Sequence, residues 1–174
     1  MLKYLYYFLI SIVLVFLQQN ILPNLGFLNN LNFLLVILVF ITIISGFDLG
    51  FIFALIVGFI YNIFSFLPLG TFIIIYLVIL ILVNFLYKNV LINFSFLTNF
   101  ILIIMATLLY NFLLPFVTYI FYALNIIKLY IVIDNDYIIN FLKAIILNSL
   151  LISFIFIIAK LTIQKLNLVF LIKK

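Results

Sequence analysis

Asp134 and Asp136 are the first residues of this sequence whose type and spacing could do chemistry. They flank Asn135, and oxygen ligands at this spacing can hold Ca²⁺. A complete calcium loop needs further oxygen ligands and a terminal Glu, and the chain contains no Glu. We therefore interpret the two aspartates as part of a solvated loop rather than a metal site.

Ser153 and Lys160 form the second candidate, because they lie on one face of a predicted helix in the manner of a serine–lysine dyad. Seven residues of helix rise about 10 Å, which is beyond the hydrogen-bond reach that a nucleophile and its base require. The chain also lacks His, Cys, Glu and Arg, so the usual general bases and thiolate groups are missing. We expect no enzymatic activity, no cofactor and no metal.

A stripe of small residues is the sharpest pattern in the chain. Gly46, Gly50, Ala54, Gly58 and Asn62 follow one another at intervals of four, which places them on one face of a helix. Small residues let helices approach closely, and in lipid this packing replaces the hydrophobic drive. The stripe predicts a helix-packing surface that ends in a hydrogen-bonding amide. Its counterpart is either another helix of this chain or a helix of a partner protein.

Asn84, Asn111 and Asn148 are further polar residues inside apolar segments. A pathway for solutes or ions across a membrane usually carries ionisable groups, and no acidic residue falls deep in a predicted helix. Hydrogen bonding between helices is the interpretation that these amides favour.

The composition identifies the environment that these residues share. Of the 174 residues, 71% are hydrophobic and 6% are charged, whereas soluble domains carry about 25% charged residues. The charged set consists of eight Lys and three Asp. The net charge of +5 is spread over flanks and tails, which indicates orientation in a lipid bilayer rather than a nucleic-acid surface.

Six apolar segments are candidates for helices that cross the hydrocarbon core. They cover residues 5–21, 31–45, 49–67, 70–87, 99–124 and 144–164. A single helix over residues 31–67 would be roughly 55 Å long, so we expect a hairpin that turns at Asp48, and an interfacial turn from Tyr137 before the sixth helix. The sequence predicts an all-α, polytopic membrane bundle of about six transmembrane helices that forms one domain over residues 1–174.

The distribution of lysines predicts the orientation of this bundle. With the N-terminus inside, the inner side receives most of the lysines and the outer side receives two, in agreement with the positive-inside rule. The inner set is Lys3, Lys88, Lys160, Lys165, Lys173 and Lys174, and the outer set is Lys128 and Lys143. Both ends of the chain are therefore expected in the cytoplasm.

A series of motifs runs through the first 90 residues. The first predicted helix ends in Leu17-Gln18-Gln19, with Pro23 soon after, and a second apolar helix follows. The motifs that come next are Gly46 and Gly50, then Gly58-Phe59-Ile60-Tyr61-Asn62, and finally Pro68-Leu69-Gly70-Thr71, which opens the fourth helix. This arrangement resembles the rod shape-determining protein MreD family of bacteria. Two positions depart from the family pattern, which often has Asp where this chain has Asn62 and Pro where it has Asn32.

The resemblance implies a non-enzymatic scaffold of the cell-elongation machinery, which directs lateral peptidoglycan synthesis and cell shape. It also implies a multi-pass protein of the bacterial inner membrane that acts with a bitopic MreC-like protein and other elongation proteins. No nucleic acid and no small-molecule substrate is expected for such a scaffold.

A second class of membrane protein stays open at this point. The substrate-binding subunits of energy-coupling-factor vitamin transporters are similar in size and also have six helices. They usually carry an Ala-rich stripe on the first helix, whereas residues 5–16 of this chain contain no Ala or Gly and its small-residue stripe lies on the third helix.

Overall fold

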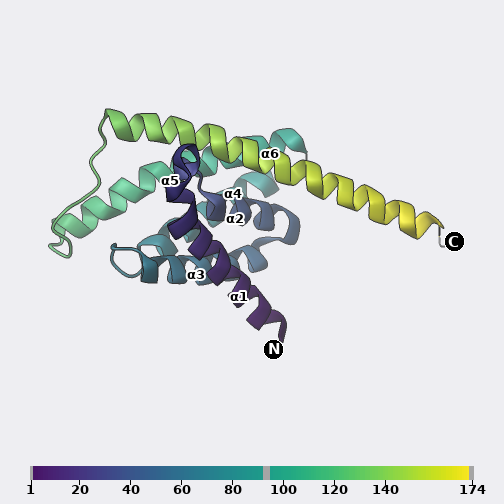
Figure 1. Cartoon of the computed structure of the whole chain (residues 1–174), viewed down its shortest axis with the longest axis horizontal. Coiled ribbons are helices and arrows are strands. Elements are labelled where there is room, and N and C mark those ends of the chain that lie inside the picture. Colours follow the sequence, from purple (N-terminus) through teal and green to yellow (C-terminus); the bar gives the residue numbers. More distant parts are fainter. Residues whose placement is uncertain (1, 92–94, 173–174) are drawn as a thin grey trace.

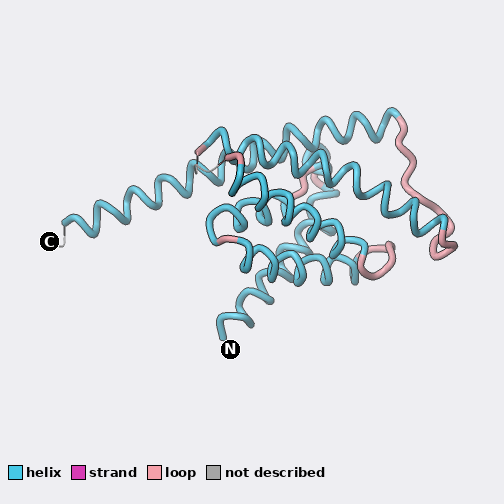
Figure 2. The backbone as a smooth tube through the Cα atoms, turned by 180° about the vertical axis from the view of Figure 1, so that it is seen from behind, coloured by secondary structure: helices cyan, strands magenta, loops and turns pink. Residues whose placement is uncertain are grey.

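The computed structural model describes the backbone of residues 2–91 and 95–172 and the side chains of residues 9–91 and 95–162. Within these ranges the chain is helical and contains no β-strand (Figures 1 and 2). The six α-helices are α1 (Leu2–Phe16), α2 (Phe33–Ser45), α3 (Phe47–Phe64), α4 (Thr71–Asn89), α5 (Phe96–Ala123) and α6 (Asn135–Ile172). The structure thus confirms the predicted all-α class.

Four of these helices, α3 to α6, are long and apolar enough to cross a membrane. The helix α2 has 13 residues, or about 20 Å of helix, which is shorter than the hydrocarbon core of about 30 Å. The first apolar stretch with described side chains, Leu9–Asn24, is also short. The chain is therefore compatible with a membrane protein of four spans or more, and six crossings with both ends inside stay a prediction.

The connection between α1 and α2 is more structured than the sequence indicated. The helix α1 continues into a π-helical turn at Leu17–Ile21, which is followed by 3₁₀ turns at Leu22–Asn24 and Gly26–Asn30. Local winding of this kind keeps backbone groups hydrogen-bonded while the chain changes direction.

The predicted turn at Asp48 is wrong by two residues. Gly46 alone separates α2 from α3, with φ +85°, a conformation that glycine adopts without the steric penalty of a Cβ. Asp48 instead lies in the first turn of α3, where its negative charge faces the positive end of the helix dipole.

The sixth helix begins at Asn135 rather than near residue 144, and Tyr137 lies in its first turn instead of in a separate interfacial turn. The Asp134 side chain caps this start, because its Oδ1 accepts a hydrogen bond of 2.8 Å from the Tyr137 backbone N–H. With 38 residues, α6 is about 57 Å long, and its last turns extend beyond the other helices (Figures 1 and 2). The side chains of Lys3, Lys165, Lys173 and Lys174, which support the predicted orientation, lie outside the described residues.

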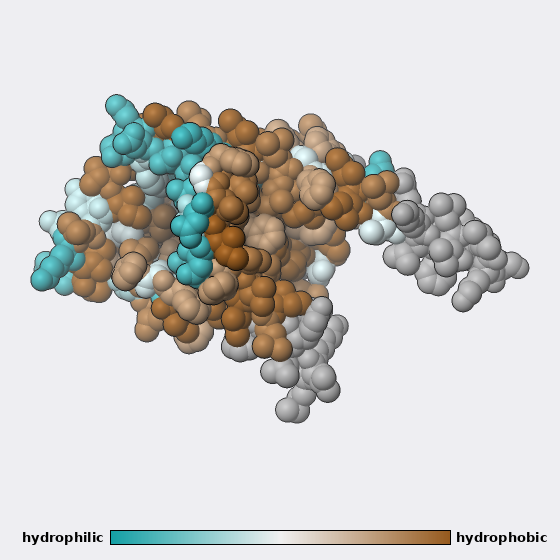
Figure 3. Space-filling model, in the orientation of Figure 1, coloured by the Kyte–Doolittle hydropathy of each residue, from teal (hydrophilic) through white to brown (hydrophobic). Residues whose placement is uncertain are grey.

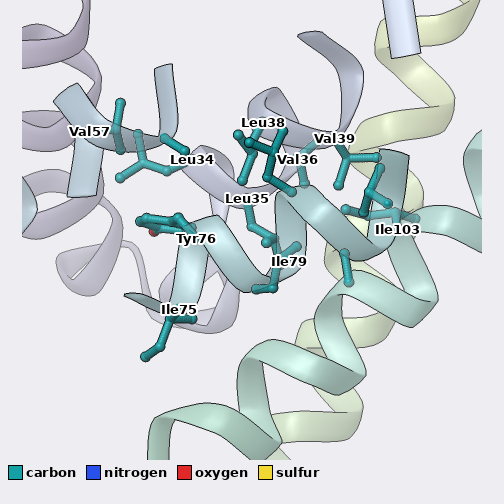
Figure 4. Close-up of a cluster of buried hydrophobic side chains, with 14 of the residues drawn as sticks. Leu34, Leu35, Val36, Leu38, Val39, Val57, Ile75, Tyr76, Ile79 and Ile103 are labelled. Carbon is teal, nitrogen blue, oxygen red and sulfur yellow. The ribbon is translucent and has the colours of Figure 1, made fainter. Parts of the chain in front are cut away.

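The short helix α2 lies at the centre of the bundle and contacts α3, α4, α5 and α6. Leu34, Leu35, Val36 and Val39 have no exposed surface, and Figure 4 shows them among side chains of the neighbouring helices. Since protein rather than lipid covers most of α2, this helix does not need the length of a lipid-exposed span.

The face of the bundle that Figure 3 shows is predominantly apolar. Hydrophilic atoms gather at the side of the α5–α6 loop and in a narrow strip at the α1–α2 connection, while brown apolar atoms cover most of the rest. Exposed large side chains such as Ile63, Ile81, Phe112 and Leu150 belong to this apolar surface. A surface of this kind is stable in contact with lipid and would be a liability in water.

Candidate functional site

The small-residue stripe lies inside the bundle rather than on its surface. Gly50, Ala54, Gly58 and Asn62 are all buried. A Cβ atom added to Gly58 would lie 2.8 Å from the Ile73 Cα and 3.0 Å from its backbone N. At this point α3 and α4 therefore approach each other backbone to backbone, as helices with small residues do in membranes.

The other end of the stripe meets side chains instead of backbone. A Cβ atom on Gly50 would lie 2.7 Å from both the Leu80 Cδ1 and the Thr42 Oγ1, which belong to α4 and α2. Gly46 stands apart from this interface because it forms the turn before α3. Four of the five stripe residues thus join α3 to the chain's own helices, and no room is left there for a partner's helix.

Asn62 joins the end of α3 to the start of α4. Its Nδ2 donates to the Pro68 carbonyl oxygen (2.9 Å), and its Oδ1 accepts from the Phe72 backbone N–H (3.1 Å). An ionised carboxylate could accept the second bond but could not donate the first. The carboxamide of Asn62 is therefore the side chain that makes both bonds of this turn.

The two glutamines of the first motif tie the end of α1 to its neighbours. The Gln18 amide donates to the Leu31 carbonyl oxygen (2.8 Å) and accepts from the Phe33 backbone N–H (2.8 Å). The Gln19 Nε2 donates to the Tyr61 carbonyl oxygen at 3.4 Å. These bonds satisfy backbone groups at the start of α2 and near the end of α3 that would otherwise be left unpaired.

A polar cavity of about 250 Å³ lies where the start of α2, the middle of α5 and the first half of α6 meet. Two tyrosines, Tyr110 and Tyr137, take part in its lining, together with Phe141 and Ala144. Five asparagines supply the rest: Asn30, Asn32, Asn111, Asn140 and Asn148. The residues that line the cavity include no charged side chain.

Asn32 and Asn148 form the floor of this cavity and join three helices. The Asn32 backbone N–H donates to the Asn148 Oδ1 (2.9 Å), and the Asn148 Nδ2 donates to the Thr107 Oγ1 (3.1 Å). The Asn32 Oδ1 caps α2 by accepting from the Leu35 N–H (3.1 Å). Asn148 is completely buried, and both its Oδ1 and its Nδ2 form hydrogen bonds within the protein.

The rim of the cavity is held by a second set of bonds. The Tyr137 hydroxyl donates to the Asn111 carbonyl oxygen (2.6 Å), and the Asn111 Nδ2 donates to the Thr107 carbonyl oxygen (2.9 Å). A longer bond of 3.3 Å joins the Asn30 Nδ2 to the Asn140 Oδ1. The rim therefore connects α5 and the α1–α2 connection to α6.

Sequence reasoning identified Asn111 and Asn148 only as amides within helices and overlooked Asn30, Asn32 and Asn140. One local signal was available, because Asn140, Ala144 and Asn148 follow at intervals of four and so share a face of α6. The contributions of the α1–α2 connection and of α5 come from distant parts of the chain and leave no such pattern.

In each of the two residue pairs considered first for chemistry, one residue makes a local hydrogen bond and the other is exposed. Asp134 caps α6, and Asp136 is exposed in its first turn. The Ser153 hydroxyl donates to the Ser149 carbonyl oxygen one turn earlier (2.7 Å), while Lys160 is exposed.

Comparison of the chain with protein-family models, with curated proteins and with solved structures finds no match. The likeness to the MreD family therefore rests on the sequence motifs alone.

Proposed function

We propose that this chain is a membrane scaffold of the bacterial cell-elongation machinery, similar in role to the MreD family. The observation that supports the proposal is the convergence of the motif residues on one connected part of the fold. Gln18 and Gln19 bond to the starts and ends of neighbouring helices, and Gly58 lies against the α4 backbone.

The motif residues thus set the relative positions of α1, α2, α3 and α4. Residues with this role are the ones that proteins of a common fold must retain, because each satisfies a backbone group or permits a close approach that few other residues could. The resemblance accordingly covers a coherent structural unit of the first 90 residues. The scaffold role itself comes from the family, and the absence of His, Cys, Glu and Arg from the sequence agrees with it.

The surface for a partner must lie outside the stripe, because α2 and α4 already fill it. An apolar groove of about 390 Å³ lies between α1, α2 and α3. Its walls include Leu14 of α1, Ile37 and Ile41 of α2, and Ile52 and Phe53 of α3. In this proposal the branched and aromatic walls receive the apolar side chains of a single membrane-spanning helix, the kind of segment that a bitopic MreC-like protein would supply.

Co-purification from detergent extracts of the native membrane tests this role. The tagged chain should recover an MreC-like protein of the same organism, and Ile41→Trp should reduce that recovery because the indole fills the groove. Ile81→Trp is the matched control, since Ile81 is exposed on α4 and lies outside the groove.

Equal recovery of the partner by both tryptophan variants would contradict the placement of the contact in the groove. Failure of the unaltered chain to recover any elongation protein would contradict the scaffold role. Recovery of an ATPase-linked coupling subunit in its place would favour the vitamin-transporter alternative.

A further inference from the structure

The polar cavity has features that helix packing alone does not explain. Asparagines and tyrosines from three separate parts of the chain line a cavity of about 250 Å³. Two other large grooves of the same protein are apolar. Helix packing in membranes normally excludes such a polar cavity, because polar side chains bond directly to the next helix.

Asn32 lies between the cavity and a buried hydroxyl that has no hydrogen-bond partner among the described residues. The Tyr76 hydroxyl is fully buried and has no hydrogen-bond partner among the described residues, although the Asn32 carboxamide lies near it and near the Tyr110 hydroxyl. The Asn32 Oδ1 already accepts the hydrogen bond that caps α2. Its Nδ2 is therefore the atom that can donate to these phenol oxygens or to a group in the cavity. Tyr76 itself does not line the cavity, whereas Asn32 and Tyr110 do, so these two residues are the ones through which a ligand in the cavity could extend the network.

We propose that the cavity binds a small, uncharged, planar molecule that carries both hydrogen-bond donors and acceptors, such as an amide-bearing aromatic ring. This inference does not depend on the scaffold role, because the cavity and the groove between α1, α2 and α3 share no lining residue.

The size of the cavity limits the ligand to a single ring with one substituent. At about 30 Å³ per molecule in the liquid, its volume corresponds to roughly eight water molecules. Pockets for drug-sized ligands are larger, at about 300–1,000 Å³.

The chemistry of the lining sets the charge and shape of the ligand. An unpaired charge is costly to bury, and the lining offers no ionised side chain to pair with one. Carboxamides both donate and accept, so a ligand with adjacent donor and acceptor atoms could bond to the Asn111 Oδ1 and the Asn140 Nδ2. The rings of Tyr110 and Phe141 at the same site favour a flat, aromatic molecule.

Nicotinamide and nicotinate provide a matched pair of probes, because they differ in charge and hardly in shape. Nicotinamide should raise the melting temperature of the purified full chain in detergent in a concentration-dependent way, and uracil, a second neutral ring, should do the same. Nicotinate should give no shift at equal concentrations. A shift of equal size with nicotinate, or no shift with either neutral ring at millimolar concentrations, would overturn the proposal.

Asn140→Leu tests whether nicotinamide binds in this cavity. The substitution removes one amide from the exposed rim while keeping a similar side-chain volume, and it should weaken nicotinamide binding about tenfold, the equivalent of one hydrogen bond. Asn89→Leu, on an exposed residue at the end of α4, is the control and should bind as the unaltered chain does. Unchanged binding by a folded Asn140→Leu protein would overturn the assignment of the site. Should that variant fail to fold, the discrimination between nicotinamide and nicotinate by the unaltered chain still decides the proposal.

Discussion

Substitution of Gly58 tests the packing of α3 against α4 more directly than any other change. The Cβ atom of an alanine at this position would lie 2.8 Å from the Ile73 Cα and 3.0 Å from the Ile73 backbone N. Real Cβ atoms do not make contacts this short, and the atoms that they meet belong to a helix backbone. The two helices must therefore move apart, which loosens the contacts on both sides of the stripe.

The expected loss follows from two opposing terms. Alanine is better than glycine inside a helix by about 1 kcal/mol, and overpacking costs about 1–3 kcal/mol. We expect Gly58→Ala to lower the free energy of unfolding by up to about 2 kcal/mol. Gly58→Leu adds three more carbon atoms at the same point and should exceed this loss.

Gly50→Ala is the matched control within the same stripe. The added Cβ would meet the ends of the Leu80 and Thr42 side chains at 2.7 Å, and side chains can change rotamer where a helix backbone cannot. The helix-propensity gain is the same for both substitutions. Gly50→Ala should therefore destabilise the protein less than Gly58→Ala.

Thermal unfolding of the detergent-purified proteins measures these differences. A loss of about 2 kcal/mol should lower the melting temperature by roughly 4–8 °C in a chain of this size. If Gly58→Leu melts within a degree of the unaltered protein, the close approach of α3 and α4 is not present. If Gly50→Ala is the more damaging of the two alanine substitutions, the distinction between backbone and side-chain contacts is refuted.

Three further predictions concern the turn, the topology and the chemistry of the chain. Asn62→Asp should lower the free energy of unfolding by about 1–3 kcal/mol, because a carboxylate cannot donate to the Pro68 carbonyl oxygen, and an equally high melting temperature would contradict this role. Reporter fusions in the loops should alternate between the outside and the inside of the membrane. A C-terminal reporter found outside would exclude the proposed orientation. The outside positions are Asn30, Pro68 and Asn135, and the inside positions are Lys88 and Lys174. Ser153→Ala and Lys160→Ala should leave growth and cell shape unchanged, and loss of function in a stably inserted Ser153→Ala protein would reveal an active site.

The helical class could be predicted because it depends on local properties of the chain. Each apolar segment is dominated by Leu, Ile, Phe and Val, and a helix satisfies its backbone within the segment itself. The spacing of Gly50, Gly58 and Asn62 likewise predicts a packing face from residues that are close in sequence. Errors arose at helix ends, where one residue decides the geometry. Gly46 alone makes the turn that was expected at Asp48, and the cap by Asp134 starts α6 nine residues early.

The counterpart of the stripe and the polar cavity could not be predicted in this way. An apolar helix face fits another helix of the chain, a partner or lipid equally well, so the placement of Gly58 against Ile73 depends on how all the helices pack together. The cavity joins Asn32 to Asn148, which are 116 residues apart, and each asparagine alone reads as an ordinary polar residue. Bonds between distant residues form only when the fold brings their atoms within about 3 Å, and no local pattern in this chain carries that information.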